Sequence, residues 1–253
     1  MKSKVHIVGA GPGSADLLTL RAVKAIQNAD VILYDALICK ETLDFAPAYC
    51  EMIYVGKRAA KHEYSQEKIN QLIVENAFTY KNVVRLKGGD PYIFGRGHEE
   101  YEYVSAFGID VEVVPGISSA IAVPELENIP LTKRGVSESF WVVTATNKKG
   151  ELTNDIKQTV HSNATIVILM GVGKLPEIVE LYAKNGKENL PIAVIQNGSL
   201  PSQKIVTGTI KTIQEVVEKN KIGTPAIIVL GEVVASRPEF LLEQINVNQN
   251  RKK

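Results

Sequence analysis

Residues 83–100 combine the side chains and the backbone freedom best suited to chemistry. They read VVRLKGGDPYIFGRGHEE, a β-branched strand pattern followed by two pairs of glycines. Gly88 and Gly89 have no Cβ, so the backbone there can turn sharply or approach a ligand closely. Asp90 places a carboxylate on the same turn, and Arg96 adds a cation between two further glycines. Taken alone, this loop fits a solvated surface turn as well as it fits a ligand site.

Four other expected strands end in a similar way. Short apolar strands at 4–8, 31–34, 52–55 and 111–114 run into GAGPG, an aspartate, GKR and PGISS respectively. Helical spacing at 17–29, with Asp16 as the expected N-cap, and at 65–73 and 98–107 separates these strands. This alternation predicts a mostly parallel sheet, in which ligands bind beyond the carboxyl ends of the strands. Five such ends favour a ligand crevice over five unrelated turns.

The loop at 9–13 invites comparison with a dinucleotide-binding turn. A Rossmann fingerprint has its third glycine three residues after the second, whereas the glycines here fall at 9, 11 and 13. Pro12 also lacks the N–H that would help to cradle a pyrophosphate. Asp35 lies near the distance expected of a ribose-binding acid, so a dinucleotide-dependent oxidoreductase remains an alternative. A P-loop is excluded, because no GxxxxGK[ST] occurs.

Composition excludes other classes of function. Twenty-nine basic and 28 acidic residues nearly cancel, which argues against nucleic-acid binding by bulk charge. Cys39 and Cys50 are too few for a disulfide framework, and four scattered histidines make a metal site improbable. No apolar run reaches the length of a membrane span. We therefore expect a cytoplasmic protein without a metal or a membrane partner.

The second half of the chain predicts a separate sheet. Strand patterns at 140–144, 165–170, 191–195, 204–209 and 224–231 are closely spaced, with glycine and proline between them. Such density suits a mixed sheet. The polar, glycine-containing segment near 131–136 suits a linker. We expect an α/β domain at 1–131, a second at 136–240, and a polar tail at 241–253.

Several of these segments together closely resemble uroporphyrinogen-III C-methyltransferases. The resemblance covers almost the whole chain, and it lies in residues 8–22, 34–37, 55–58, 86–100, 114–120, 129–135 and 224–226. It implies a two-domain tetrapyrrole methylase fold with the active site in the cleft between the domains. It also implies that the chain moves methyl groups from S-adenosylmethionine to C2 and C7 of uroporphyrinogen III. The products would be precorrin-2, formed via precorrin-1, and S-adenosylhomocysteine, and the protein would be a homodimer.

The resemblance also assigns site residues. The proton acceptor falls on Asp35 and the proton donor on Lys57, and a substrate anchor is the alternative role for Lys57. The cofactor contacts fall on Pro12, Gly88, Gly89, Asp90, Ile93, Ser118, Ser119, Met170, Gly198, Thr224 and Ala226. By position alone, Met170 fits a core residue better than a cofactor wall.

The carboxylates of uroporphyrinogen require cations in a nearly neutral protein. Arginine forks suit planar carboxylates, and we expect Arg96, Arg134 and Arg58 to bind the substrate. Other cations of the same half are Arg21, Lys57, Lys61 and Arg85, each of which alone fits an ordinary surface charge.

One departure from the resemblance affects the junction of the halves. Lys133 stands where these enzymes usually have histidine, which puts any histidine-dependent role there in doubt. A methylase acting on a later precorrin is an alternative function, and so is a cofactor-binding regulatory protein without catalysis.

Overall fold

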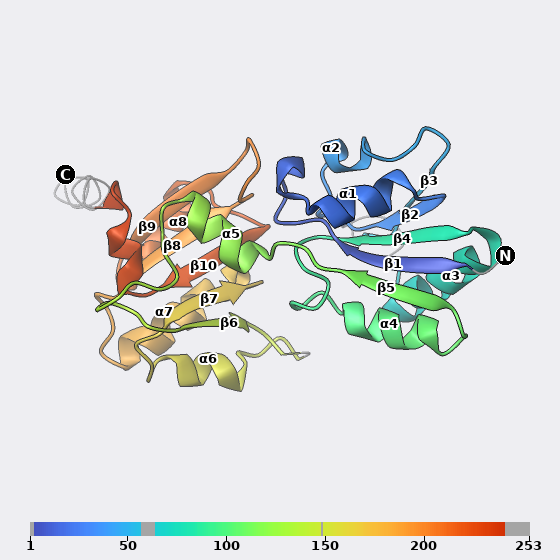
Figure 1. Ribbon diagram of the computed structural model, residues 1–253. Coiled ribbons are helices and arrows are strands. Elements are labelled where there is room, and N and C mark those ends of the chain that lie inside the picture. Colours follow the sequence, from blue (N-terminus) through green and yellow to red (C-terminus); the bar gives the residue numbers. More distant parts are fainter. Residues whose placement is uncertain (1–2, 57–63, 148, 241–253) are drawn as a thin grey trace. The chain divides into compact units, whose positions relative to one another are not determined.

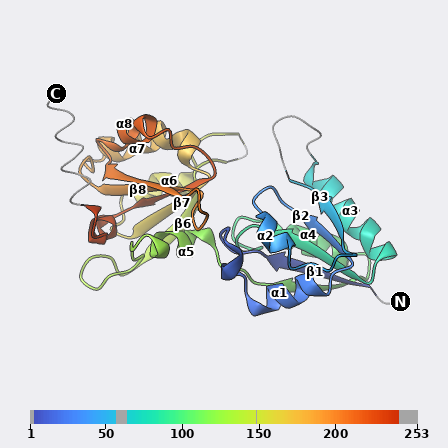
Figure 2. The ribbon, with the colours of Figure 1, turned by 90° about the horizontal axis from the view of Figure 1, so that it is seen from above.

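The chain divides into two compact units, residues 1–118 and residues 119–253. The structure is a computed structural model that describes residues 3–56, 64–147 and 149–240 (Figure 1). Each unit consists of one sheet with helices on both faces (Figure 2). None of the described helices is both long and apolar enough to cross a membrane.

The first unit is built on a parallel sheet. Its strands are β1 (Lys4–Gly9), β2 (Val31–Tyr34), β3 (Glu51–Tyr54), β4 (Asn82–Lys87) and β5 (Asp110–Val114). They lie in the order β3-β2-β4-β1-β5, and each neighbouring pair is parallel. All the carboxyl ends therefore reach one edge of the sheet, as the alternating pattern predicts.

Helices cover the two faces of this sheet in accordance with the strand period of two. One face carries Val31, Val83 and their equivalents, and it packs against α3 (Gln66–Thr79) and α4 (Gly97–Ser105). The opposite face carries Ile32 and Val84, and it packs against α1 (Leu20–Gln27). In Figure 1, α1 and the short α2 (Lys40–Leu43) lie above the sheet and α3 and α4 below it.

The start of α1 differs from the sequence prediction. The helix begins at Leu20, and its N-cap is Thr19, whose hydroxyl accepts from the Ala22 N–H at 3.1 Å. Asp16 instead lies in a 3-10 turn, η1 (Ala15–Leu17), where it accepts a hydrogen bond from Ser14. Its carboxylate is used locally, so Asp16 does not cap the helix.

The second unit is built on a mixed sheet. Its strands are β6 (Phe140–Thr144), β7 (Thr165–Leu169), β8 (Pro191–Gln196), β9 (Lys204–Thr209) and β10 (Ala226–Leu230). They lie in the order β6-β7-β10-β8-β9; β6 and β7 are parallel, and the other neighbours are antiparallel. The predicted α/β class, with a parallel first sheet and a mixed second sheet, is confirmed.

Helices again cover both faces of the second sheet. One face packs against α6 (Asn154–Thr159), α7 (Leu175–Lys184) and α8 (Ile213–Lys219). The other packs against α5 (Ser119–Leu126) and the short turn η3 (Glu232–Ser236). A short 3-10 turn, η2 (Val172–Lys174), precedes α7.

The expected domain boundary at 131–136 lies inside the second unit. The structure divides between Ser118 and Ser119. Val123 of α5 and Ile129 are buried in the same cluster as Ile195 of β8 and Val233 of η3. Residues 119–131 therefore contribute to the second core.

Candidate functional site

Two glycine loops are joined by backbone hydrogen bonds at the edge where the parallel strands end. Gly11 and Gly89 form an antiparallel bridge, with Gly89 N donating to Gly11 O at 2.7 Å and Gly11 N donating to Gly89 O at 3.2 Å. Ala10 N donates to Lys87 O at 2.8 Å. Pro12 thus lies beside the 88–90 turn. The N–H groups of Ala10, Gly11 and Gly89 are therefore used within the protein.

A third loop, which follows β5, packs against the first two loops so closely that their main-chain atoms are in van der Waals contact. A Cβ on Gly116 would lie 2.2 Å from Gly89 O and 2.7 Å from Gly9 Cα, and a Cβ on Gly9 would lie 2.5 Å from Gly116 N. Real Cβ atoms do not approach this closely. Only glycine allows the tips of β1, β4 and β5 to meet.

Asp90 locks these loops together. Its Oδ1 accepts from Tyr92 N at 2.8 Å, and its Oδ2 accepts from Gly116 N at 3.1 Å. The carboxylate therefore organises the turn. Each carboxylate oxygen has a further lone pair that can accept a hydrogen bond. Asp90 could therefore still contact the cofactor, as predicted, while it holds the turn. Ser118 is buried where the same loop leaves the first unit.

The second unit brings its own predicted cofactor residues to one edge. Met170 directly follows β7, Ala226 begins β10 beside it, and Gly198 follows β8. Asn197 N donates to Pro225 O at 3.0 Å, which joins the segment of Gly198 to that of Thr224. Ser119 is the first residue of α5. These residues cluster within their unit.

Met170 is a surface residue. Its side chain is 64% exposed and its backbone has φ 55°, in the left-handed region. Such a conformation is uncommon for a residue other than glycine. The interpretation of Met170 as a core residue is therefore wrong. The proposed role of its side chain in lining a cofactor site stays a prediction.

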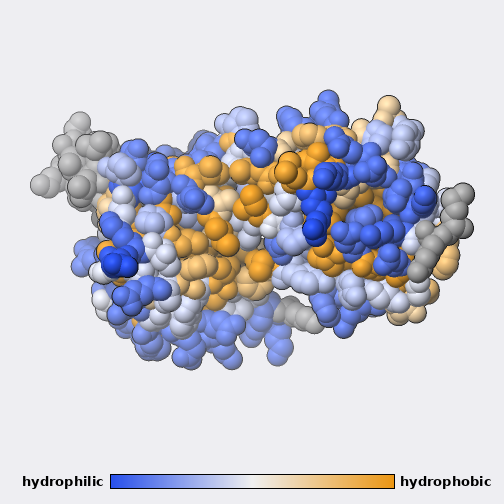
Figure 3. Space-filling view, viewed as in Figure 1, coloured by the Kyte–Doolittle hydropathy of each residue, from blue (hydrophilic) through white to orange (hydrophobic). Residues whose placement is uncertain are grey.

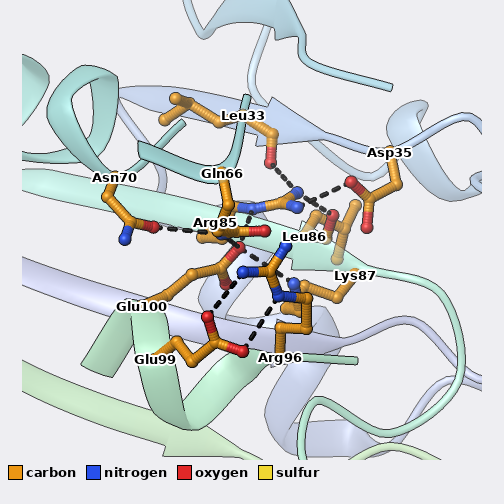
Figure 4. A network of polar contacts seen from close by, with 10 residues as sticks. All are labelled: Leu33, Asp35, Gln66, Asn70, Arg85, Leu86, Lys87, Arg96, Glu99 and Glu100. Atoms are coloured by element: carbon orange, nitrogen blue, oxygen red, sulfur yellow. Dashed lines mark hydrogen bonds and ion pairs between the residues drawn. The ribbon is translucent and has the colours of Figure 1, made fainter. Parts of the chain in front are cut away.

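Asp35 is tied to a buried cluster of charges that the sequence did not reveal (Figure 4). Arg85 donates from Nη2 to Asp35 Oδ1 at 2.6 Å and from Nε to Glu100 Oε1 at 3.1 Å. Lys87 Nζ lies 3.0 Å from the same Glu100 oxygen. The side chains of Arg85, Lys87 and Glu100 are 2%, 4% and 0% exposed, against 27% for Asp35. The cluster reaches solvent at Asp35.

The electrostatics of the cluster are unequal. Burial lowers the pKa of Lys87, and the neighbouring charge of Arg85 lowers it further. Burial also acts to lower the pKa of Arg85, but the charges of Glu100 and Asp35 outweigh it and raise that pKa. Arg85 is thus the permanent cation of the cluster. Strand alternation could have indicated that Arg85 and Lys87 are buried, because both lie on the same face of β4 as Val83, which packs in the core.

The predicted substrate cations fall into different places. Arg96, in the left-handed region with φ 59°, is exposed and donates to Glu99 at 2.9 Å and 2.6 Å. The hydrogen bonds that Arg96 donates to Glu99 raise the pKa of Arg96. Arg134 is exposed in the second unit. Lys57, Arg58 and Lys61 lie outside the described residues.

Arg85 corrects one interpretation of the sequence. The sequence groups it with the cations available to substrate carboxylates, but its guanidinium is buried and each of its three nitrogens bonds a protein acceptor. It cannot bind a substrate directly.

The 88–90 turn leaves room for a ligand. Nothing lies within 4 Å of the position that a Cβ on Gly89 would take, and φ there is 69°. Ile93 follows on the same loop and is 44% exposed, and Leu37, which packs against Gly88, is also exposed. Apolar surface is visible on both units in Figure 3. A bare turn with apolar neighbours and no phosphate cradle fits a nucleoside without phosphates. Across the described residues, no three His, Cys, Asp or Glu side chains group as a metal site would require.

Known proteins show what this arrangement belongs to. The sequence profile of the tetrapyrrole (corrin/porphyrin) methylases matches residues 4–214. The chain is 46% identical over 236 residues to the uroporphyrinogen-III C-methyltransferase of Methanocaldococcus jannaschii, covering 92% of this chain and 98% of that protein. It is 45% identical over 238 residues to the siroheme synthase of Methylobacillus flagellatus, covering 94% of this chain and 51% of that protein. The chain thus spans about half the length of that relative.

A solved structure agrees with the fold. The uroporphyrin-III C-methyl transferase from Thermus thermophilus, in complex with S-adenosylhomocysteine, is 37% identical with a TM-score of 0.79. The match covers 92% of this chain and 99% of that one. The two-unit α/β fold and its glycine-tipped edge thus define a methyltransferase. The chain belongs to the tetrapyrrole methylase family, which confirms the resemblance drawn from the sequence.

Proposed function

We propose that this chain transfers methyl groups from S-adenosylmethionine to C2 and C7 of uroporphyrinogen III, giving precorrin-2 via precorrin-1. The main support is the 46% identity to a uroporphyrinogen-III C-methyltransferase over 92% of this chain and 98% of that one. The fold match to an S-adenosylhomocysteine complex supports the same methyl donor.

The glycine turn fits the cofactor by its chemistry. S-adenosylmethionine supplies a methyl group on a sulfonium, and it has no phosphates to be bound. The open space beside Gly89 admits a nucleoside, with Pro12, Gly88, Asp90, Ile93 and Ser118 as the proposed contacts from the first unit. The proposed contacts from the second unit are Ser119, Met170, Gly198, Thr224 and Ala226.

Asp35 is the proposed proton acceptor. A pyrrole α-carbon of a porphyrinogen is already electron-rich, so methyl transfer needs alignment and exclusion of water more than activation. A proton must then leave the ring system to restore its conjugation. Asp35 projects from the end of β2 with Oδ1 bound by Arg85, and its Oδ2 remains to take that proton. Lys57 is the proposed donor or substrate anchor.

Substrate binding requires cations around the acceptor. We propose Arg96 and Arg134, which are exposed, together with Arg58, as partners of the substrate's carboxylates. The left-handed backbone of Arg96 next to Gly97 fixes the direction in which this side chain leaves the loop. That the pocket lies in a cleft between the two halves stays a prediction.

The alternatives weighed from the sequence have unequal support. The dinucleotide interpretation has less support, because Gly11 N and Gly89 N already bond each other's carbonyls and the family match is to tetrapyrrole methylases. A methylase acting on a later precorrin shares the same fold and cofactor. Turnover on the two substrates separates these functions.

The test is an anaerobic incubation of the protein with S-adenosylmethionine and uroporphyrinogen III, followed by mass spectrometry. We expect a dimethylated product and two equivalents of S-adenosylhomocysteine for each product molecule. Asp35→Asn is expected to lose most of the turnover while still binding S-adenosylhomocysteine in a calorimeter. Turnover of a later precorrin without turnover of uroporphyrinogen III would establish the other methylase. Cofactor binding without turnover of any precorrin would establish the regulatory protein.

We further propose a cytoplasmic homodimer, as the resemblance implies. Light scattering of the purified chain at working concentration gives its mass directly. A monomer mass at enzymatically active concentrations would contradict the dimer.

A further inference from the structure

The guanidinium of Arg85 is held in one orientation by groups from three elements. Its Nε donates to Glu100 of α4, and its Nη1 donates to Leu86 O at 3.0 Å and to Leu33 O at 3.4 Å. The remaining hydrogen bond, from Nη2, goes to Asp35 Oδ1 at 2.6 Å. Figure 4 shows Arg85 between the carboxylates of Asp35 and Glu100. Buried groups therefore set the orientation of the guanidinium, and the guanidinium in turn orients Asp35, which is partly exposed.

Glu100 holds the inner end of this chain of contacts. Its Oε1 accepts from Arg85 Nε, from Lys87 Nζ at 3.0 Å and from Gln66 Nε2 at 3.1 Å, and Gln66 also bonds Asn70. Glu100 Oε2 is buried and has no hydrogen-bond partner in the part of the chain that the structure describes. All of the carboxylate's contacts therefore fall on the oxygen that faces Arg85.

Arg85 joins the buried acid of the cluster to the exposed one. Arg85 and Lys87 are the buried basic groups, and Glu100 and Asp35 are the acidic groups that contact them. Of the two basic groups, Arg85 contacts both acids. Any change in how Glu100 holds the guanidinium therefore reaches Asp35 through Arg85.

We propose that Arg85 is a positioning residue for Asp35: it fixes Oδ1, directs Oδ2 outward as the proton-accepting atom, and is itself held by Glu100. This inference rests on the proposed function, in which Asp35 accepts the proton. Arg85 acts only through Asp35, because its own guanidinium is buried.

Two variants of the cluster should lower kcat without weakening cofactor binding. Arg85→Met frees Asp35 from its partner, so Asp35 is misplaced and kcat is expected to fall by on the order of 10- to 100-fold. Glu100→Gln keeps the shape but replaces charge-assisted hydrogen bonds to Arg85 with weaker ones, so kcat is expected to fall by a smaller factor. The affinity for S-adenosylhomocysteine, measured by calorimetry, should stay at the wild-type value in both variants.

A matched control separates this effect from loss of any ion pair in the sheet. Lys4→Met removes the cation of the exposed pair Lys4–Glu112 at the opposite end of β1, and it should leave kcat unchanged. Arg85→Lys keeps the charge but not the fork, so it should recover only part of the kcat that Arg85→Met loses. Equal kcat values for wild type, Arg85→Met and Glu100→Gln would overturn the proposal.

A structural readout keeps the inference separate from the proposed function. In crystals of Arg85→Met, the Asp35 carboxylate should occupy new or multiple rotamers, whereas an unmoved carboxylate would refute positioning. If Arg85→Met does not fold, the fall of kcat in Glu100→Gln and the Asp35 rotamer in Arg85→Lys decide the matter in the same way. If the wild type does not methylate uroporphyrinogen III, or if Asp35→Asn keeps full turnover, the proposed function fails while the crystallographic test stands.

Discussion

Gly116→Ala tests whether the meeting of three strand tips depends on the absence of side chains. The new Cβ would lie 2.2 Å from Gly89 O and 2.7 Å from Gly9 Cα. An ordinary carbon–oxygen contact requires about 1 Å more. Both neighbours are main-chain atoms at the ends of hydrogen-bonded strands, so neither can rotate away. The loop after β5 must move out instead.

The cost follows from overpacking. Inserted carbon atoms in a packed region cost about 1–3 kcal/mol, and the rigid neighbours here favour the upper end. The displaced loop also carries the Gly116 N–H that bonds Asp90 Oδ2, so the 88–90 turn loses an anchor. A displacement of this size at a binding site can cost on the order of 100-fold. We expect unfolding free energy to fall by about 2–3 kcal/mol and S-adenosylhomocysteine affinity to fall by at least tenfold.

Gly108→Ala is the control for a simple loss of stability. Gly108 has φ 72° and nothing within 4 Å of a built Cβ, so alanine there brings backbone strain of about 1–2 kcal/mol without a clash. Urea unfolding and titration calorimetry on both variants make the comparison. If Gly116→Ala keeps wild-type affinity and unfolds within about 0.5 kcal/mol of the wild type, the close meeting of the tips is refuted.

Three further predictions concern stability and the second unit. Burial lowers the pKa of Lys87 in the folded state below its ordinary value of 10.5. The unfolded chain therefore binds more protons between these two pKa values, and the wild-type unfolding free energy should rise with pH over that window. Lys87→Met should remove this rise in chemical denaturation. Burial likewise lowers the pKa of His6 below 6.5. The unfolding free energy should therefore fall as the pH drops below 6.5, because the unfolded chain takes up a proton there more readily than the folded one. A His6→Gln variant that shows the same fall would contradict this assignment. In the second unit, the side chain of Gln203 accepts from Ser199 N at 2.6 Å and donates to Glu127. Gln203→Leu removes both hydrogen bonds beside Gly198, so it should weaken S-adenosylhomocysteine binding roughly fivefold, about 1 kcal/mol. An unchanged affinity in calorimetry would show that the loop of Gly198 does not depend on these hydrogen bonds.

The edge where the parallel strands end was predictable because its causes are local. Runs of β-branched residues predict the strands, and the glycines that follow them predict where each strand ends in a tight turn. The rule that parallel strands share a carboxyl edge then places Gly9, Gly89 and Gly116 near one another. The sequence could not show that main chain meets main chain there, because that distance depends on the twist and register of β1, β4 and β5.

The buried cluster could be predicted only in part. Alternation places Arg85 and Lys87 on the face of Val83, which a helix must cover. Nothing in the sequence shows that Glu100 is the buried acid of α4, since Glu99 next to it is exposed and binds Arg96 instead. The rotation of α4 about its own axis selects between them, and that rotation comes from packing on α3 and β5.

The domain boundary and the start of α1 show two other limits. The segment at 131–136 has the composition of a linker, but Ile129 and Val123 belong to the second core. Composition does not show which core an adjoining helix joins. Asp16 and Thr19 are both acceptable caps by residue type. The hydrogen bond from Ser14 to Asp16 decides between them.

The most direct test is a crystal structure of the chain grown with S-adenosylhomocysteine. The nucleoside should lie against the main chain of residues 88–90, with Asp35 Oδ2 facing the same space. Density for the ligand elsewhere on the molecule, with the tips of β1, β4 and β5 in contact only with solvent, would contradict the assignment of this edge as the methyl-transfer site.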